Sequence, residues 1–518
     1  MINRRVSRVD KPNILMIVAD QLCPQALPCY GHRLVHAPSI SALAQRATVF
    51  ENAYANFPLC APSRASFLTG RYPSAIGVWD NASELPASTP TVSHYLRGAG
   101  YEATLCGKMH FVGPDQLHGY GERLVTDIYP SNFTWTPDWT EGPRNRPTGI
   151  NMRAVIDSGP AIRTLQIDYD DEVEFFGLQK LYDFARFSDK RPFFLTISFT
   201  HPHSPFIAKQ EFWDLYNHDD IDIPRVPPIP LSQQDEMSRW LHYAHGGDLD
   251  EVLPEHVRNA RHAYYGMISY IDAKVGRILS TLEEVGLDKS TLVVFAADHG
   301  EMLGERGAWY KQYFYEPSVR VPLIIVEPGQ TKGRRIDTPV SLIDLAPTFI
   351  DYAIPGTDWQ PASRLDGQTL KPFLRDEAVQ ERRPVISEYT GEGSCAPCRM
   401  IRKGDFKLIY THGFPDLLYD LHNDPLEMNN LANSIDYTAT VHSLRCEILK
   451  DWNPVVINQQ VLQSQRERRL IQATTGGEPN WAFKARPDDD RRYVRNSGAV
   501  QTKAKARYPF VAAPPIRR

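Results

Sequence analysis

The chain is poor in the features that mark several large classes of protein. It has seven cysteines in 518 residues, and an odd number in so long a chain does not suggest a disulfide framework. Its formal net charge is −5, which argues against a nucleic-acid partner held by bulk electrostatics. No apolar run is long enough to span a bilayer. What remains is an ordinary globular composition, with 42% hydrophobic and 23% charged residues.

The first residues also lack the pattern of a secretory signal. Residues 1–8 are basic, but the apolar run at residues 14–19 is short and ends at Asp20 without a small-residue cleavage site. The run is therefore typical of a buried strand. We expect a cytoplasmic protein with no membrane partner.

Apolar strands alternate with amphipathic helices through the first two thirds of the chain. The runs at residues 13–20 and 291–297 are continuously apolar, as expected for central parallel strands. Residues 257–287 carry apolar side chains at three-to-four spacing, which indicates a long helix. The alternation predicts a doubly wound α/β sheet whose functional residues follow the carboxyl ends of its strands. Further expected helices are 39–49, 91–96 and 342–352, and further strands are 101–105, 193–199 and 321–326.

The composition changes near residues 361–372. Beyond this point, short strands are expected at 385–389, 399–402 and 406–410, followed by a helical stretch at 441–471. The last segment is rich in Arg, Asp and Pro and has little apolar periodicity. We therefore predict a catalytic domain at 11–370, a smaller α+β subdomain at 371–475 and an extended tail at 476–518. The tail is a candidate for contacts between subunits of an oligomer.

One stretch is more informative than any other. It runs Pro58-Leu-Cys60-Ala-Pro-Ser-Arg64-Ala-Ser-Phe-Leu-Thr-Gly-Arg71. A cysteine followed by x-Pro-Ser-Arg, an apolar pair and Thr-Gly-Arg resembles the type I sulfatase signature. The alternative is a buried structural cysteine, the usual fate of a lone thiol. Because the match is long and has partners elsewhere in the chain, we favour the functional interpretation.

The resemblance implies a particular covalent chemistry. In type I sulfatases, a maturation enzyme oxidises the cysteine to formylglycine, an aldehyde that hydrates to a geminal diol. One hydroxyl of the diol attacks sulfur to form a covalent sulfo-enzyme intermediate, and collapse of the hemiacetal then expels sulfate. The resemblance also implies the fold of the alkaline phosphatase superfamily, a doubly wound mixed sheet with helices on both faces. Cys60 would then mature to formylglycine, with a formylglycine-generating enzyme as a partner.

Two residue pairs at strand ends are candidate metal ligands. Asp20-Gln21 follows the first strand and Asp298-His299 follows a later one. Most sulfatases have Asp-Asp and Asp-Asn here, and the choline-sulfatase and phosphonate-hydrolase branches share both departures. With Cys60, these donors suit one divalent ion, Ca²⁺ or Mn²⁺, and the imidazole favours Mn²⁺. Taken singly, an N-cap aspartate and an Asp-His-Gly turn are equally good interpretations; taken together, the residues favour a metal.

A sulfate monoester needs cations around sulfur, a fixed nucleophile and a proton for the leaving oxygen. The resemblance assigns these tasks to single residues. Arg64 stabilises the hydrated aldehyde, and Lys108 holds a sulfate oxygen as a point charge. His110 takes the proton of the diol, His203 binds sulfate, and Lys311 lies near the leaving oxygen. His201 is a further candidate on the substrate side or in support of it.

The resemblance extends from Lys11 to about Asn496 and is nearest to choline sulfatases. The stretches that carry it are residues 107–119, 126–130, 135–138, 198–205 and 493–496. Choline sulfate contains a cation, which needs an aromatic face and a carboxylate. Trp135 and Glu388 are the candidates. A packed tryptophan and a solvated strand-end carboxylate are equally good interpretations of these two.

Two stretches depart from the choline-sulfatase pattern. Residues 141–162 lack its aromatic and histidine residues, and residues 480–484 lack an acid that completes the cation pocket, for which residues 488–490 could substitute. Three functions therefore compete. The first is a homo-oligomeric sulfuric ester hydrolase that cleaves choline-O-sulfate to choline and sulfate. The second is an aryl or alkyl sulfatase, or a phosphonate or phosphate monoester hydrolase, on the same scaffold. The third is a non-catalytic anion-binding protein with an unconverted Cys60.

Overall fold

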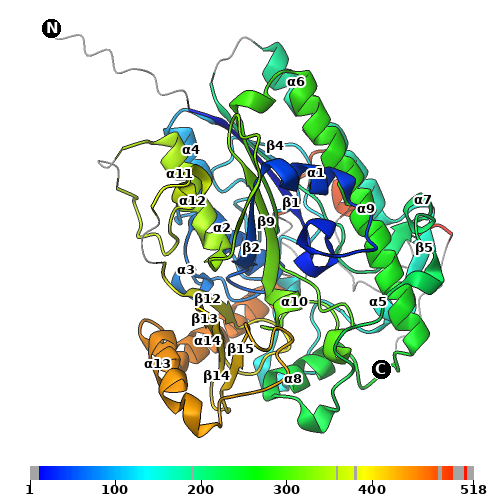
Figure 1. The fold of residues 1–518 in the computed structure, drawn as a ribbon, viewed down its shortest axis with the longest axis vertical. Coiled ribbons are helices and arrows are strands. Elements are labelled where there is room, and N and C mark those ends of the chain that lie inside the picture. Colours follow the sequence, from blue (N-terminus) through cyan, green and yellow to red (C-terminus); the bar gives the residue numbers. More distant parts are fainter. Residues whose placement is uncertain are drawn as a thin grey trace.

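The computed structural model describes residues 11–187, 191–356, 360–378, 382–475, 481–493 and 507–509. Within these residues, a nine-stranded sheet forms the body of the molecule and a separate four-stranded sheet lies at one end (Figure 1). A short pair, β5 (Gly159–Ala161) with β7 (Ile207–Lys209), is parallel.

The main sheet is built around β1 (Asn13–Ala19). This strand pairs in parallel with both β6 (Phe193–Ser198) and β8 (Thr291–Ala297). Every residue of β6 and β8 is buried, which explains their continuous apolar sequences. Because the three strands are parallel, the residues that follow them meet at one edge of the sheet. The full order is β10 (Arg334–Ile336), β2 (Thr48–Tyr54), β9 (Arg320–Val326), β8, β1, β6, β3 (Glu102–Gly107) and β4 (Glu122–Arg123), with β11 (Val340–Ser341) paired to β2.

Helices cover both faces of this sheet (Figure 1). One side carries α1 (Pro38–Arg46), α6 (Leu165–Arg186) and the long α9 (Pro254–Glu284), and the other carries α2 (Cys60–Thr69), α4 (Val92–Gly98) and α11 (Leu345–Ala353). The predicted fold class, an alkaline-phosphatase-like mixed sheet with helices on both faces, is confirmed. Shorter helices are α3 (Pro73–Ile76), α5 (Arg153–Ile156), α7 (Gln210–Trp213), α8 (Glu236–Ala244), α10 (Glu316–Val319), α12 (Lys371–Arg375) and α15 (Asp489–Arg492).

The second sheet is antiparallel throughout. Its strands are β12 (Val385–Tyr389), β13 (Cys398–Lys403), β14 (Phe406–Thr411) and β15 (Leu417–Asp420). Asn56 joins this sheet to the main domain, because its side chain donates to the carbonyl of Ile386 and its own carbonyl accepts from the backbone N–H of Glu388. Helices α13 (Thr438–Leu449) and α14 (Pro454–Thr474) complete the region, drawn in orange in Figure 1.

The structure differs from the sequence expectations in two elements. The helix expected over 39–49 ends at Arg46, and Thr48 begins β2, which pairs with β9. The single helix expected over 441–471 is two helices, because Pro454 has no N–H to continue one and Asn453 caps the second. Helix α6 and strand β15 were not among the predicted elements.

The described part of the predicted tail folds back on the main domain. Thr126 donates its hydroxyl to Asp489 at 2.7 Å, and the ring of Tyr493 lies edge-on to Tyr169 with centroids 5.3 Å apart. Residues 494–496, which contribute to the family resemblance, and the remainder of the tail lie outside the described residues.

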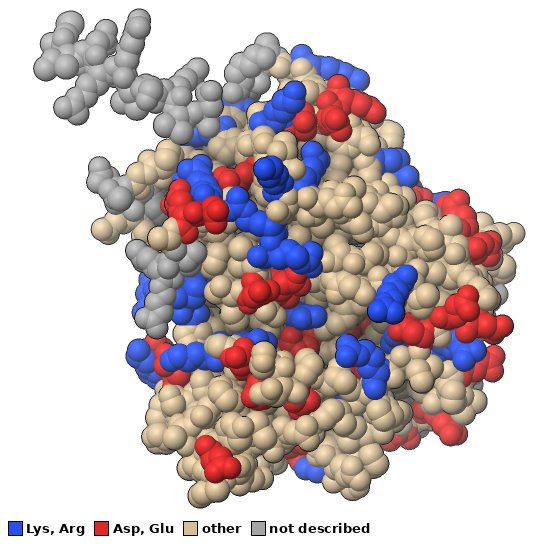
Figure 2. All heavy atoms as spheres, viewed as in Figure 1, with Lys and Arg blue, Asp and Glu red and all other residues tan. Residues whose placement is uncertain are grey.

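The surface and the helices agree with the small net charge and the absence of long apolar runs. On the face drawn in Figure 2, basic and acidic side chains are interspersed. No helix in the described ranges is long and apolar enough to cross a bilayer.

Candidate active site

Cys60 is the first residue of α2, a helix that is buried along its whole length. The next residue, Ala61, donates its backbone N–H to Asn81, and Ser63 donates its hydroxyl to the carbonyl of Asp298 at 2.6 Å. The start of α2 is thus bound to the end of β8. Burial raises the pKa of the Cys60 thiol to about 12, against the charges of nearby Lys311 and Arg64.

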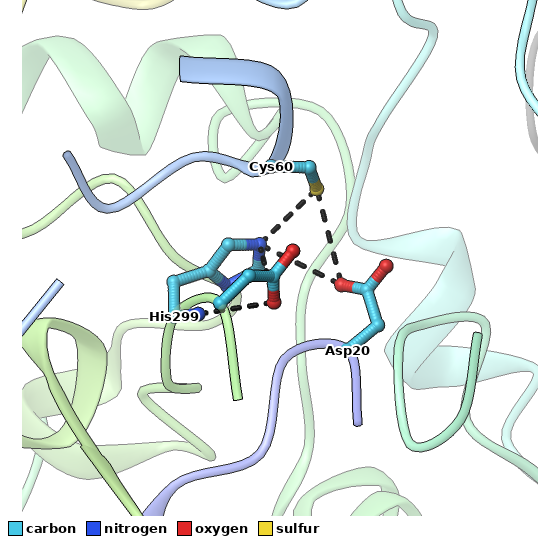
Figure 3. A group of neighbouring side chains, drawn as sticks. Asp20, Cys60 and His299 are labelled. Atoms are coloured by element: carbon cyan, nitrogen blue, oxygen red, sulfur yellow. Dashed lines mark hydrogen bonds and ion pairs between the residues drawn. The ribbon is translucent and has the colours of Figure 1, made fainter. Parts of the chain in front are cut away.

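Four possible ligand groups converge at this point: Asp20 after β1, Asp298 and His299 after β8, and Cys60. Figure 3 shows Asp20, Cys60 and His299 turned toward one another. The Sγ atom of Cys60 lies 3.1 Å from Nε2 of His299 and 3.9 Å from Oδ1 of Asp20. The same Nε2 atom lies 3.6 Å from Oδ1 of Asp20 and 3.7 Å from Oδ1 of Asp298. Ligand atoms from three separate elements therefore surround one small volume.

The surroundings of this group fit a divalent cation. Lys108 binds Oδ2 of Asp20 and Arg64 donates to Oδ2 of Asp298 at 2.8 Å, so each carboxylate keeps Oδ1 toward the centre. Nδ1 of His299 donates to the carbonyl of Gly300, which leaves the lone pair of Nε2 for a metal. Burial lowers the pKa of His299 to about 3, so the ring is neutral. This buried group could hold a metal ion.

Gln21 adjoins the group but makes different contacts. Its backbone N–H donates to Oδ1 of Asp298 at 3.1 Å, and its side-chain oxygen accepts from Lys311 at 2.6 Å. Its side-chain nitrogen donates to Glu301, which also accepts from the backbone of Tyr310. Gln21 as a ligand stays a prediction, and Glu301 fixes the amide with its oxygen toward Lys311.

Three buried cations surround the thiol. Arg64 donates to Asp298, to the carbonyl of Lys108 and to Ser198. Lys108 lies 4.2 Å from the ring centre of Tyr129, and Lys311 contacts Nε2 of His203. Positive groups fixed around a nucleophile position are the arrangement that stabilises a tetrahedral oxyanion.

The ring of His110 is available to bind a ligand. Both of its ring nitrogens are buried without a hydrogen-bond partner among the described residues. Its backbone N–H donates to Asp127, which holds the loop in place and also accepts from Met109 and Arg123. Burial, and then the charge of Lys108, lowers the pKa of His110 well below its usual value. A neutral ring is therefore available to a ligand beside the cations.

His201 lies behind the group. Its Nδ1 atom is 2.6 Å from Oδ2 of Asp170, and its ring packs edge-on against Tyr270. Its carbonyl accepts the backbone N–H of Asp20. His201 therefore supports the end of β1, and a contact with substrate stays a prediction.

The two candidates for cation binding have different surroundings. Trp135 packs with ring centres 5.0 Å from Tyr129 and 5.8 Å from His110, beside the catalytic candidates. Glu388 accepts from the backbone and hydroxyl of Ser74 at 2.9 and 2.8 Å and pairs with Arg399 at 3.3 Å. Both carboxylate oxygens of Glu388 are thus already engaged, and the structure does not place them among the groups around Cys60.

Sequence reasoning missed a second carboxylate, Glu392. Its Oε2 atom is buried without a hydrogen-bond partner among the described residues, and burial raises its pKa to about 7. Its charge acts on both Lys311 and Cys60, and neighbouring Gly391 packs against Leu59. The sequence here, Gly391-Glu-Gly-Ser, reads only as a loop. Asp127, by contrast, lies in the stretch 126–130 already singled out by the resemblance.

The mixed sheet, with this buried group at the carboxyl edge of its strands, defines a hydrolase of the alkaline phosphatase fold. Residues 12–355 match the sulfatase family, and residues 304–453 match the C-terminal region of N-sulphoglucosamine sulphohydrolase. The chain belongs to the sulfatase family and is a sulfuric ester hydrolase. Both predictions are confirmed. Membership implies in general a metal ion and a formylglycine, for which the buried group offers the residues.

Relatives with named activities cover nearly the whole chain. It is 42% identical over 511 residues to the choline-sulfatase of Rhizobium meliloti (strain 1021), covering 96% of this chain and 99% of the relative. It is 29% identical to an arylsulfatase of Clostridium perfringens, covering 85% and 94%. Among solved structures, the phosphonate monoester hydrolase of Agrobacterium radiobacter matches with a TM-score of 0.67 and 26% identity, covering 87% and 96%.

Proposed function

We propose that this enzyme hydrolyses choline-O-sulfate to choline and sulfate, with Cys60 matured to formylglycine. The observation that carries the choline assignment is the 42% identity, over nearly the full length of both chains, to a choline-sulfatase. The buried cationic surroundings of Cys60 support the sulfate half of the substrate, and the free oxygen of Glu392 supports the cationic half.

The mechanism assigns a task to each buried group. Formylglycine at position 60 would supply a hydrated aldehyde as nucleophile. Asp20, Asp298 and His299, with Gln21 as a further candidate, would hold a divalent ion, Ca²⁺ or Mn²⁺, which would supply positive charge beside it. Arg64 and Lys108 neutralise the anionic oxygens of the sulfate.

The remaining groups bind the substrate anion and move protons. His203 binds the sulfate, and Lys311 donates a proton to the leaving oxygen. His110 is neutral and its ring has no hydrogen-bond partner among the described residues, so it accepts the proton released at residue 60. In this proposal sulfur is attacked by oxygen from residue 60, so a covalent sulfo-enzyme precedes the release of sulfate.

The cation of choline needs an aromatic face and an uncompensated carboxylate. Trp135 and Tyr129 supply aromatic surface beside His110. One carboxylate oxygen of Glu392 is buried without a hydrogen-bond partner in the described ranges, whereas Glu388 already binds Ser74 and Arg399. We therefore assign the cation site to Trp135 and Glu392, with Glu388 as the competing candidate.

A comparison of two substrates tests this assignment. Glu392→Gln should raise KM for choline sulfate several-fold or more, since a cation site of this kind contributes about 0.5–2 kcal/mol. The same variant should leave kcat/KM for a neutral aryl sulfate nearly unchanged. Trp135→Leu should have the same effect. Glu388→Gln is the matched control and should leave the ratio of kcat/KM for the two substrates unchanged. Equal loss on both substrates would remove the cation site from the proposal.

The second candidate function is hydrolysis of a phosphonate monoester or an aryl sulfate. The match to phosphonate monoester hydrolases favours it, because phosphonate and sulfate esters both present tetrahedral anions to the same cations. Rates on choline sulfate, an aryl sulfate and an aryl phosphonate, measured with fully converted enzyme, decide between the two. A preference for either aryl substrate would replace choline sulfate as the assigned substrate.

Conversion of Cys60 is tested separately. Peptide mass analysis of active enzyme should find formylglycine at position 60, and Cys60→Ser should lose nearly all turnover while its circular dichroism stays unchanged. A free thiol at position 60 in fully active enzyme would contradict the proposed nucleophile. A free thiol in folded protein without turnover on any of the substrates would support the non-catalytic alternative.

A further inference from the structure

In the thiol form, the sulfur of Cys60 and three donor atoms beside it, one each from Asp20, Asp298 and His299, lie within 4.8 Å of one another. This is close to the spacing of a tetrahedral zinc site. Zinc bonds of about 2.0–2.3 Å place neighbouring ligand atoms about 3.3–3.8 Å apart in a tetrahedron. The separations given above are 3.1 and 3.9 Å from Sγ, and 3.6 and 3.7 Å from Nε2 of His299. All four scatter around the tetrahedral edge.

The donors are also oriented as zinc ligands before any metal arrives. Asp20 and Asp298 each present one carboxylate oxygen inward, since Lys108 and Arg64 bind the outer ones. The inner oxygen of Asp298 is held there by the backbone N–H groups of Gln21 and His299, at 3.1 and 3.0 Å. The tautomer of His299 is fixed by its bond to Gly300. A thiolate, a neutral imidazole and two carboxylate oxygens make a four-coordinate set.

We infer that the unconverted protein is a Zn²⁺-binding form, in which Cys60, His299, Asp20 and Asp298 hold one zinc ion. Binding forms a Zn–S bond and releases the single thiol proton of Cys60 to solvent, while the imidazole and carboxylates bind without losing a proton. Because the proposal concerns the thiol, it does not depend on the conversion of Cys60 or on the choline assignment.

The chemistry of sulfur explains why this form differs from the matured enzyme. Thiolate is a soft ligand that selects zinc, whereas oxygen donors suit Ca²⁺ and Mn²⁺. Conversion of Cys60 removes the sulfur and leaves oxygen donors and one imidazole in its place. The oxidation state of residue 60 therefore decides which class of metal the group binds. Zinc bound to the thiolate would also hold the chain in its inactive form.

The experiment uses the full chain produced without a formylglycine-generating enzyme, with the thiol at position 60 verified by peptide mass. Zn²⁺ is titrated in competition with a chromophoric chelator, and Co²⁺ is used as a spectroscopic probe. We expect one tight zinc equivalent and a thiolate-to-cobalt charge-transfer band in the near ultraviolet. Cys60→Ser should lose the band and bind zinc at least about a hundredfold more weakly, because even residues outside the ligand set cost about 10–100-fold.

Two controls separate this group from other thiols. Cys446 is exposed and lies 3.7 Å from His442, so Cys446→Ser removes the most accessible alternative zinc ligand and should leave the tight equivalent and the band unchanged. Fully converted enzyme, whose activity proves that it is folded, should show no thiolate band.

The proposal is overturned if Cys60→Ser keeps zinc affinity within threefold of the thiol form, if its cobalt band persists, or if the converted enzyme shows the same band. It is also overturned if Cys446→Ser removes the tight equivalent. None of these results would contradict the proposed hydrolysis. Conversely, a converted enzyme without activity would contradict the proposed function but not the proposed zinc site.

Discussion

At the scale of single residues, His110 is buried, and neither of its ring nitrogens has a hydrogen-bond partner within the part of the chain that the structure describes. A buried polar group without a partner costs stability unless a ligand completes it. His110→Ala should therefore lower kcat for a sulfate ester by about 10²–10⁴-fold, the usual contribution of a positioned proton-transfer group. The melting temperature of the variant should fall only slightly, because the substitution removes packing contacts but no hydrogen bond of the ring. Steady-state kinetics and a melting curve check both parts, and an unchanged kcat would exclude His110 from the proton transfer.

Glu392 predicts a pH dependence of specificity. Its pKa is about 7 in the free enzyme, so its carboxyl is neutral below that pH and charged above it. Since only the charged form attracts an ammonium group, kcat/KM for choline sulfate divided by that for a neutral aryl sulfate should rise with pH and level off above about 7. The ratio cancels groups that both substrates use. Glu392→Gln should give a ratio independent of pH; a ratio that still rises in this variant would assign the effect to another group.

The raised pKa of Glu392 also makes the free energy of unfolding depend on pH. Its ordinary pKa of 4.5 is raised to about 7 in the folded chain, so between these values the native state holds a proton that the unfolded state has lost. Its contribution to stability is therefore complete below pH 4.5 and is lost as pH rises through 7. Glu392→Gln should remove this part of the pH dependence when chemical denaturation is compared at pH 5 and pH 8.

At the scale of elements, helix α14 reaches from the C-terminal region to the loop that supports α2. Arg468 donates to both oxygens of Asp80 at 2.7 Å, and the adjacent Asn81 accepts from Ala61, next to Cys60. Asp80 is completely buried. The helix thus fixes the start of α2 through one ion pair and one loop.

Arg468→Met should leave Asp80 buried without its cation. Breaking a buried pair on one side costs about 3–5 kcal/mol, and we expect a loss of that order together with a lower kcat. Asp80→Asn in the same chain should recover part of both losses. Arg466→Met, on an exposed position of the same helix, is the matched control and should stay within about 0.5 kcal/mol of the parent. Urea unfolding and kinetics compare the three variants with the parent. If Arg468→Met is destabilised but keeps its kcat, then α14 has a structural role only.

Elements also show where local patterns fail. The stretch 441–471 has one helical pattern, yet Pro454 divides it, because proline has no N–H and begins a new helix with Asn453 as its cap. Residues 48–49 looked helical by spacing, but β2 needs them for its pairing with β9. Sheet pairing with a strand far along the chain overrides a short local pattern.

At the scale of the whole molecule, a buried ion cluster joins the two sheets. Lys407 of β14 lies 2.9 Å from Glu316 of the main domain and 2.6 Å from Glu427 of the C-terminal region. Its side chain is fully buried. The cluster therefore couples the folding of the two parts.

Lys407→Met should leave two buried carboxylates without their shared cation. We expect a loss of about 3–5 kcal/mol and a separation of unfolding into two steps as the C-terminal sheet detaches first. Lys403→Met, half-exposed on the neighbouring strand, is the matched control and should change stability by less than about 0.5 kcal/mol. Differential scanning calorimetry distinguishes the outcomes; one cooperative transition with an unchanged midpoint would contradict the coupling.

The sequence alone determined the fold class and pointed to four residues that the structure brings together: Asp20, Cys60, Asp298 and His299. Continuous apolar runs ending in Asp20 and Asp298 are local patterns, and parallel strands carry such residues to one edge without further information. The run around Cys60 likewise holds the proposed nucleophile and Arg64 in a single stretch. Both features are set by residues that are close together in the sequence, and therefore they could be predicted from the sequence alone.

Only the tertiary structure decided what each side chain faces. Glu388 and Glu392 are both glutamates and lie four residues apart. Ser74 and Arg399 bind the carboxylate of Glu388, whereas one oxygen of Glu392 has no hydrogen-bond partner among the residues that the structure describes. Lys108 and Arg64 likewise turn the inner oxygens of two aspartates toward the thiol. The partners in each case come from distant parts of the chain. Burial then sets the energy of every unpaired charge, and burial exists only once the chain is folded.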